Sequence, residues 1–192
     1  MFVRRHPIAW VLAALAFILS AFVIYFFRDP APVPPNDERA ILSPASGSVL
    51  EVSRQADPFT GLQGNVIRIF LSVFDPHIQR APFRGKVSEV RYQNGRFLDA
   101  RDARAPFENE QNHIRLVGEG SRAATVTQIA GLIARRIVCW VKAGDTVEMA
   151  AHLGLIRFGS QVDIYLPDHA VIQVKAGDRV EVGRTLIARW NP

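Results

Sequence analysis

A long apolar run near the N-terminus constrains this chain more than any other feature of its sequence. Residues 8–27 are apolar except for Ser20 and Tyr25, and a helix needs about 20 such residues to cross the hydrocarbon core of a bilayer. Two basic residues, Arg4 and Arg5, precede the run. The sequence therefore predicts an N-terminal membrane segment followed by a separate folded part.

A cleaved signal peptide is the competing interpretation, since a basic start followed by an apolar run is also its pattern. The run is long for a signal peptide, and no small-x-small cleavage signal follows it. Instead, Arg28 and Asp29 lead into a stiff proline-rich spacer, residues 30–35. We therefore assign residues 1–35 to a membrane segment with its spacer and residues 36–192 to a folded domain.

The side of the membrane on which the domain lies depends on how the apolar run is inserted. A full span with the basic N-terminus in the cytoplasm would place the domain outside. A re-entrant or interfacial segment would leave the domain on the cytoplasmic face. The sequence leaves both arrangements open, and we expect the inner cell membrane with the domain on its cytoplasmic face.

Residues 38–192 have the pattern of a mostly β domain. Hydrophobic residues make up 48% of the chain and charged residues 21%, which suits a packed core and argues against disorder. Short β-branched runs are separated by Gly, Asp, Asn and Pro at intervals of roughly 8 to 12 residues, the spacing of a β-sandwich or barrel. The best helix candidate, residues 123–136, starts with β-branched side chains, so a strand is an alternative there. We predict an α+β, predominantly β domain with a compact sandwich or barrel-like architecture.

One short pattern occurs twice. The run Val-Lys-Ala-Gly-Asp-x-Val stands at residues 141–147 and again at residues 174–180. In both copies a Gly-Asp turn separates two strand-like stretches, and Gly supplies the positive φ that such turns need. The repeat predicts two related hairpins and two related halves of the domain, and we assign it no catalytic role.

Composition excludes several classes of function. The net charge of +5 is carried by scattered basic residues without a run of five or six, so a nucleic-acid-binding stripe is not supported. The single cysteine, Cys139, allows neither a disulfide within the chain nor a CxxC metal pair. It lies in an apolar stretch, and we expect it to be a buried small hydrophobic residue. A mild positive balance does suit an anionic lipid surface.

The informative motifs lie in a fixed order along most of the chain. They are the segments 25–30, 43–47, 70–82, 109–112, 128–137 and 155–167. A Gly-Ser pair alone, such as Gly159-Ser160, is most often a turn between strands. Taken together, the segments closely resemble the short bacterial and archaeal form of the phosphatidylserine decarboxylase family, and 156–167 is the most specific of them.

The resemblance implies a self-processing enzyme with its own cofactor. The hydroxyl of Ser160 would attack the carbonyl of Gly159, and the chain would separate into residues 1–159 and 160–192 with a pyruvoyl group in place of Ser160. Such an enzyme decarboxylates phosphatidylserine to phosphatidylethanolamine in phospholipid biosynthesis and uses neither pyridoxal phosphate nor a metal. The two products would stay together as a heterodimer or assemble further. No nucleic acid is involved.

Site residues follow from the same resemblance. Asp75 and His77 match the family's Asp-x-His segment, so His77 would be the base in self-cleavage or the proton donor after decarboxylation. Asp75 would orient His77 or cap the turn before Pro76. His113 is an alternative base, and His152 is expected to be structural.

Four further residues are candidates for substrate binding. They are Arg80, Phe158, Arg135 and Arg136. The arginines suit a lipid phosphate because a guanidinium group can offer two parallel donors to its oxygens. Solvated or carboxylate-paired positions are the alternative for each of them.

One residue departs from the family pattern. The early motif usually contains Pro-Ala-Asp-Gly, whereas this chain has Ser46 at the place of the aspartate. Asp57, Asp75 or a water held by Ser46 are the candidate replacements. Slow processing, a changed substrate or an inactive relative would each follow if none of them serves.

Two other classes of protein fit parts of the sequence. A pyruvoyl-less homologue would keep the fold and bind lipid without reaction. A membrane-anchored lipoyl- or biotinyl-like adaptor would also have paired β hairpins, but Lys86, Lys142 and Lys175 lack the setting of a modified lysine. The chain also lacks the heptad repeats of an adaptor's helical hairpin.

Overall fold

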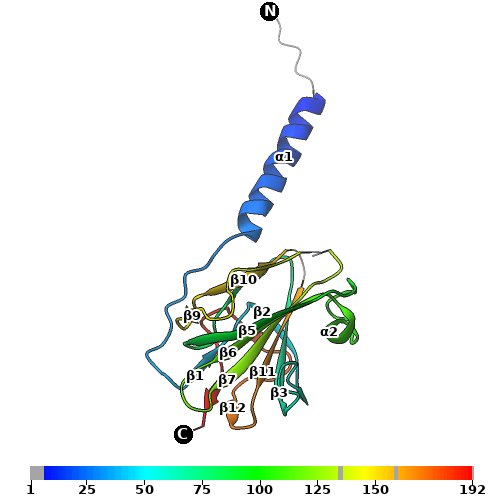
Figure 1. The fold of residues 1–192 in the computed structure, drawn as a ribbon. Coiled ribbons are helices and arrows are strands. Elements are labelled where there is room, and N and C mark those ends of the chain that lie inside the picture. Colours follow the sequence, from blue (N-terminus) through cyan, green and yellow to red (C-terminus); the bar gives the residue numbers. More distant parts are fainter. Residues whose placement is uncertain (1–6, 134–135, 158–159, 192) are drawn as a thin grey trace, which may run out of the picture.

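The computed structural model describes residues 7–133, 136–157 and 160–191, and it shows one apolar helix attached to a β-rich domain (Figure 1). The elements, in chain order, are α1 (Pro7–Phe26), β1 (Ala40–Leu42), β2 (Gly47–Ala56), β3 (Gln63–Leu71), β4 (Ile78–Arg80), β5 (Gly85–Gln93), α2 (Ala105–Glu108), β6 (Gln111–Val117), β7 (Ala123–Ile129), β8 (Ile137–Cys139), β9 (Thr146–Val147), β10 (His152–Ile156), β11 (Ser160–Leu166), β12 (Ala170–Ile172), β13 (Arg179–Val180) and β14 (Leu186–Trp190).

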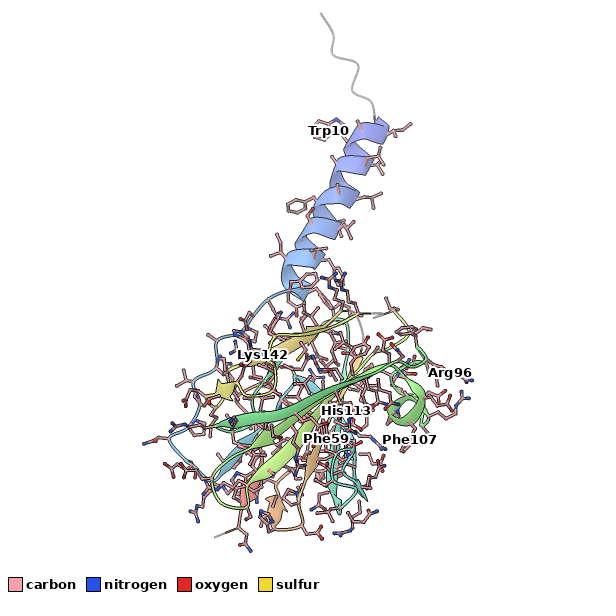
Figure 2. The ribbon with its side chains drawn as sticks, in the orientation of Figure 1. Trp10, Phe59, Arg96, Phe107, His113 and Lys142 are labelled. Atoms are coloured by element: carbon pink, nitrogen blue, oxygen red, sulfur yellow. The ribbon has the colours of Figure 1, made fainter. Side chains whose placement is uncertain are left out.

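Helix α1 projects away from the domain, as predicted for a membrane segment. Its 20 residues correspond to a length of about 30 Å, which matches the hydrocarbon thickness of a bilayer. Trp10, Phe17 and Ile24 are 68%, 74% and 75% exposed, and Trp10 points away from the helix axis into the surroundings (Figure 2). Among the described residues, this is the one helix long and apolar enough to cross a membrane.

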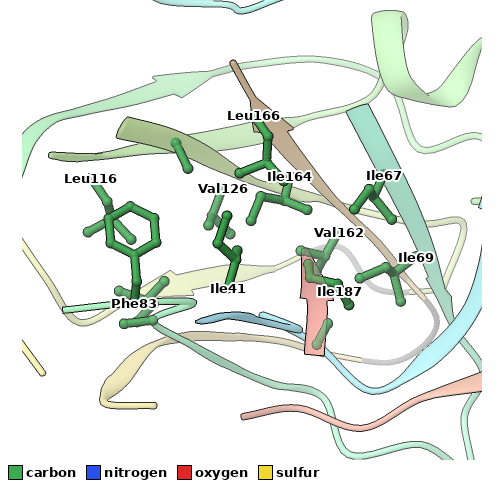
Figure 3. Packing of buried hydrophobic residues seen from close by; sticks show 14 of the residues in the cluster. Ile41, Ile67, Ile69, Phe83, Leu116, Val126, Val162, Ile164, Leu166 and Ile187 are labelled. Atoms are coloured by element: carbon green, nitrogen blue, oxygen red, sulfur yellow. The ribbon is translucent and has the colours of Figure 1, made fainter. Parts of the chain in front are cut away.

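The domain is built from one large sheet and two small ones. Eight strands form the large curled sheet in the order β13-β2-β3-β11-β7-β6-β5-β9, and the small sheets have the orders β1-β14-β12 and β4-β10-β8. Ile41 and Ile187 of one small sheet pack against Ile69, Val162 and Ile164 of the large sheet (Figure 3). The predicted mostly β sandwich-like architecture is confirmed.

Residues 123–133, the described part of the helix candidate 123–136 that precedes its gap, do not form a helix. Residues 123–129 are strand β7, which pairs with both β6 and β11. β-branched side chains lose rotamer freedom in a helix and pack well on a pleated surface. Thr125, Val126 and Thr127 are all fully buried in β7, so the strand alternative was correct.

The two repeated hairpins occupy opposite edges of the large sheet. Gly144 has φ 100° and Gly177 has φ 92°, and the preceding lysine N–H groups donate to the carboxylates of Asp145 and Asp178 at 2.9 Å. The first hairpin continues into β9, which pairs with β5, and the second into β13, which pairs with β2. The strand order is therefore symmetric about the β11/β7 pair, which confirms two related halves.

The symmetry extends to backbone detail. Ala150 and Gly183 have left-handed φ values of 63° and 67°, and they follow β9 and β13 respectively. Ala150 N–H donates to the carbonyl of Ala81 and Gly183 N–H to that of Ser43, both at 2.8 Å. A Cβ atom on Gly183 would lie 3.2 Å from the Ala150 Cβ, so the two corresponding turns meet inside the domain.

Candidate active site

Ser160 is the first residue of β11, a central strand of the large sheet. It pairs with Leu71 of β3 and faces the core with Val162 and Ile164, because alternate residues of a strand share a face. The side chain is fully buried, and its hydroxyl has no hydrogen-bond partner among the described residues. A buried polar atom left without a partner costs about 1–3 kcal/mol, so this hydroxyl is a candidate for a chemical role.

His77 lies between β3 and β4 and is fully buried. Its Nδ1 is 2.8 Å from the carbonyl oxygen of Asp75. A carbonyl only accepts hydrogen bonds, so Nδ1 carries the proton and the lone pair of the neutral ring is on Nε2. Burial lowers the pKa of His77 to about 4, the positive charge of Arg28 acts in the same direction, and Asp75 opposes both. His77 is therefore a neutral imidazole near pH 7, with Nε2 able to accept a proton.

The fold brings Ser160 and His77 to the same end of the domain. Ile156 N–H donates to the carbonyl of His77 at 3.2 Å, and Ser160 follows Ile156 after a short connection. Gly159 and Phe158 of that connection lie outside the described residues. Four residues of chain span at most about 14 Å, which is an upper limit on the distance between the backbones of Ile156 and Ser160.

Asp75 supports the site through its backbone and closes a turn with its side chain. The carboxylate accepts hydrogen bonds from the N–H and hydroxyl of Ser72 at 2.9 and 2.7 Å, and from Arg179 at 2.5 Å. Burial opposes ionisation of Asp75, but the hydrogen bonds from Arg179 and Ser72 outweigh it and hold its pKa below the usual value. The carbonyl of Asp75 orients His77, while its carboxylate holds the β3–β4 turn.

A chain of buried side-chain amides holds the backbone carbonyl of His77 in place. Gln79 Nε2 donates to the His77 carbonyl at 2.7 Å, Gln128 Nε2 donates to Gln79 Oε1 at 2.8 Å, and Asn112 Nδ2 donates to Gln128 Oε1 at 2.8 Å. All three amide side chains are at most 2% exposed. All three lie in segments that resemble the family, but the sequence alone predicts no role for them. The available signal was amides set among β-branched residues in buried strands.

Comparison with known proteins identifies the family. The sequence profile of the phosphatidylserine decarboxylase family matches residues 19–188. Proteins named phosphatidylserine decarboxylase proenzyme from Geotalea uraniireducens and Citrifermentans bemidjiense are both 44% identical, over 181 and 178 residues, which cover 94% and 93% of this chain and 85% and 81% of theirs. The chain belongs to the phosphatidylserine decarboxylase family. A similarly named protein from Nitratidesulfovibrio vulgaris is 40% identical over 183 residues, 95% of this chain and 84% of its own.

In this member of the phosphatidylserine decarboxylase family, the Arg80 side chain is buried and makes contacts within the protein. Its side chain is 9% exposed and pairs with Asp29 at 2.6 Å, and it also donates to the carbonyl of Ala150 at 2.7 Å. The other carboxylate oxygen of Asp29 lies 2.8 Å from His152 Nε2. Arg80 thus ties β4 to the segment that follows α1, and its contact with a lipid phosphate stays a prediction.

The remaining site candidates of this phosphatidylserine decarboxylase family member lie apart from Ser160 or outside the described residues. His113 is buried, contacts Thr127 at 2.9 Å, and alternates with core residue Ile114, so it lies on the face opposite Ser160; Figure 2 shows it beside Phe59. Arg136 is exposed and its carbonyl accepts the N–H of Arg157 at 3.2 Å. Arg135 lies outside the described residues.

Ser46 occupies a cavity beside the site. Its hydroxyl accepts the N–H of Val182 at 2.9 Å, and it lines a cavity of about 370 Å³ together with Arg28, Asp75 and Arg179. Asp75 lines the same cavity as Ser46 and stays a candidate replacement for the family's aspartate. Asp57 is not such a candidate, because its carboxylate pairs with Arg115 and Thr125, whose side chains lie on the same face as His113.

Proposed function

We propose that this chain is a carboxy-lyase that converts phosphatidylserine to phosphatidylethanolamine after cutting itself between Gly159 and Ser160. Membership of the phosphatidylserine decarboxylase family over most of the chain supports the reaction. The buried Ser160 hydroxyl, without a hydrogen-bond partner among the described residues, carries the assignment of the cleavage site. Within the described residues, no group of three or more His, Cys, Asp or Glu side chains is placed to hold a metal ion.

Self-cleavage uses only groups of this chain and water. The Ser160 hydroxyl gives its proton to Nε2 of His77 and attacks the carbonyl carbon of Gly159. The bond between that carbon and the Ser160 nitrogen then breaks, the nitrogen takes up the proton as an amine, and the amide becomes an ester. Loss of the Cα proton then breaks the Cβ–O bond, which releases Gly159 as a carboxylate and leaves dehydroalanine. Water replaces the nitrogen, which leaves as ammonia, and the new chain starts with a pyruvoyl group.

The buried position of Ser160 suits a pyruvoyl group, because burial keeps the reactive ketone away from bulk water. When present, a pyruvoyl group supplies an electron-withdrawing carbonyl that stabilises the charge left by departing CO2. The part of the protein in that step is to hold the substrate and to move a proton. Neutral His77, fixed at Nδ1 by the Asp75 carbonyl, is placed to accept and return that proton.

The two products of cleavage are expected to remain one folded heterodimer. Residues 160–192 would contribute β11 to β14, and β11 pairs along its whole length with β3 and for five residues with β7. Strands β12 and β14 also complete the small sheet with β1. Breaking one bond before β11 leaves these contacts in place, so the fragments should separate only in denaturant.

Substrate binding is proposed at the connection before Ser160. Arg136 and Arg157 are both exposed and joined by a backbone hydrogen bond, so two cations flank this connection. Guanidinium groups suit a lipid phosphate. Phe158 and Arg135 stay predictions for the same surface.

We propose that α1 holds the domain at the bilayer, where the substrate head group lies, and thereby raises its effective concentration. The side of the membrane stays a prediction, with the cytoplasmic face expected. Single cysteines introduced at exposed Ser88 and at Ser121 in a Cys139→Ala background, labelled with an impermeant maleimide in intact cells, test it. Labelling without cell lysis would contradict the cytoplasmic placement.

Intact-mass measurement of the purified chain tests the proposed function. We expect fragments 1–159 and 160–192, with the second lighter than a serine-started chain by one ammonia. Ser160→Ala should stay uncut and release no CO2 from phosphatidylserine vesicles. An uncut wild-type chain after long incubation would instead favour a lipid-binding homologue without a pyruvoyl group, and CO2 release by Ser160→Ala would refute the role of Ser160.

A further inference from the structure

We propose that Phe26, the last residue of the membrane helix α1, is a positioning residue for His77, so that the anchor forms one wall of the active site. The inference rests on the proposed function, since it assigns Phe26 a part in the reaction through His77. It goes beyond tethering, because a tether needs only to hold the domain near the bilayer.

The contact between Phe26 and His77 is direct and buried. Their ring centroids are 4.3 Å apart with the planes inclined by 35°. Phe26 is 0% exposed, whereas Phe17 and Ile24 on the same helix are 74% and 75% exposed. The Phe27 ring also meets that of Phe26, edge-on at 5.0 Å. The helix is thus embedded in the domain at its last residue, and the residue it embeds against is the candidate base.

The exit turn that follows Phe26 is fixed by polar contacts. The Arg28 guanidinium stacks over the Tyr25 ring at 3.8 Å from its centroid and donates to the carbonyl of Phe74 at 2.7 Å. Phe74 immediately precedes Asp75, whose carbonyl holds His77 Nδ1. The helix end and the loop that orients His77 are therefore tied together.

A second tie joins the exit turn to the small sheet beneath it. Asp29 pairs with Arg80 of β4 at 2.6 Å and with His152 of β10 at 2.8 Å. Strand β4 begins directly after His77, and β10 ends at Ile156, which donates to the His77 carbonyl. Together the ties hold Phe26 over His77 from two sides, so the ring cannot move away without breaking these polar contacts.

Removing the Phe26 ring should change how His77 titrates. The charged and titratable groups around His77 are Asp75 on its own loop, Arg179 of β13 paired with Asp75, Arg28 and Asp29 on the exit turn, Arg80 on β4 and His152 on β10. Desolvation is the main cause of its low pKa. A void at Phe26 admits water, and the pKa of His77 should rise from about 4 toward its usual value of 6.5.

The test compares Phe26→Ala with Phe17→Ala, which makes the same chemical change at an exposed position of α1. Freshly translated chains are inserted into vesicles of phosphatidylserine and phosphatidylcholine, and the appearance of the two fragments is followed from pH 4 to pH 8. We expect Phe26→Ala to process roughly 10- to 100-fold more slowly, which is less than the full contribution of about 100- to 10,000-fold from a general acid or base, with its acid limb moved to higher pH. Phe17→Ala should match wild type, and Phe26→Leu should recover most of the rate.

Two measurements separate the possible failures. Flotation with the vesicles shows whether Phe26→Ala still inserts, and Phe26→Val, which also removes the ring and leaves a smaller void, replaces it if the alanine variant does not fold. Wild-type rate and pH profile in an inserted Phe26→Ala chain would overturn the inference. If wild type itself is never cut, the proposed function fails, and the contact is then judged by NMR titration of His77 in the Ser160→Ala background, where an unchanged pKa on adding Phe26→Ala would overturn it.

Discussion

At the scale of single residues, the amide of Gln128 is the central link under His77. Gln128→Leu keeps the approximate volume but leaves Gln79 Oε1 and Asn112 Nδ2 without their buried partner. Each such loss costs about 1–3 kcal/mol. In the uncut Ser160→Ala background, we expect Gln128→Leu to lower the free energy of urea unfolding by an amount of that order. In the chain that retains Ser160, we expect Gln128→Leu to slow self-cleavage. Gln93→Leu, at an exposed position, is the control, and equal effects of both variants would contradict the amide link.

Arg80 and Arg136 separate a structural arginine from a ligand-binding one. Arg80→Met removes a buried contact to the Ala150 carbonyl and a partly buried one to Asp29, and should lower stability by about 1–3 kcal/mol with little change in KM for vesicle phosphatidylserine. Arg136→Met should raise KM and leave stability unchanged, because Arg136 is exposed. A CO2-release assay and urea unfolding measure the two effects, and the reverse pattern would restore Arg80 as a phosphate ligand.

These residues also show what sequence can and cannot reveal about a site. Ser160 and His77 stand in recognisable motifs, so they could be named before the fold was known. The tie of Arg80 to Asp29 joins residues far apart in the chain, and nothing local to Arg80 distinguishes this partner from a phosphate. Likewise Asp57 could be offered as a substitute for the missing aspartate because one-dimensional patterns do not assign it to the opposite face of the sheet.

At the scale of elements, the two repeated hairpins provide a matched pair. Asp145 and Asp178 make equivalent hydrogen bonds to backbone N–H groups at 2.9 Å, so alanine at either position should cost a similar amount, about 0.5–1.5 kcal/mol. The second hairpin also precedes Arg179, which pairs with Asp75. Asp178→Ala should therefore slow self-cleavage, and Asp145→Ala should not. Gel analysis of fragment formation checks this, and equal cleavage rates would disconnect the hairpin from the site.

The repeat was only partly readable from the sequence. The Val-Lys-Ala-Gly-Asp runs indicated two related halves, but residues 40–49 and 78–87 also correspond, with Pro-x-x-Gly-x-Val in both. The structure explains why the sequence similarity between these two segments is weak. In residues 40–49, Ser46 lines the cavity beside the active site. In residues 78–87, the corresponding Arg84 lines a different cavity. The two copies therefore have different surroundings and need different side chains.

At the scale of the whole molecule, three buried groups set how stability depends on pH. Burial lowers the pKa values of His77 and His113 to about 4, so between pH 4 and 6.5 the unfolded chain binds more protons at these positions and stability rises with pH. Burial raises the pKa of Asp163 to about 6, so the folded chain holds its proton more tightly and this residue acts in the opposite direction. Two histidines outweigh one aspartate, and the net effect is a rise.

We therefore expect the uncut Ser160→Ala chain to gain on the order of 3 kcal/mol of unfolding free energy between pH 4 and 6.5, measured by urea unfolding followed by tryptophan fluorescence. His113→Asn, far from the site, should make this rise shallower, and Asp163→Asn should make it steeper because the opposing group is gone. The two variants must change the slope in opposite directions, since one removes a proton site of the unfolded state and the other a proton site of the folded state. Slopes that change in the same direction would show that this assignment of buried charge is wrong.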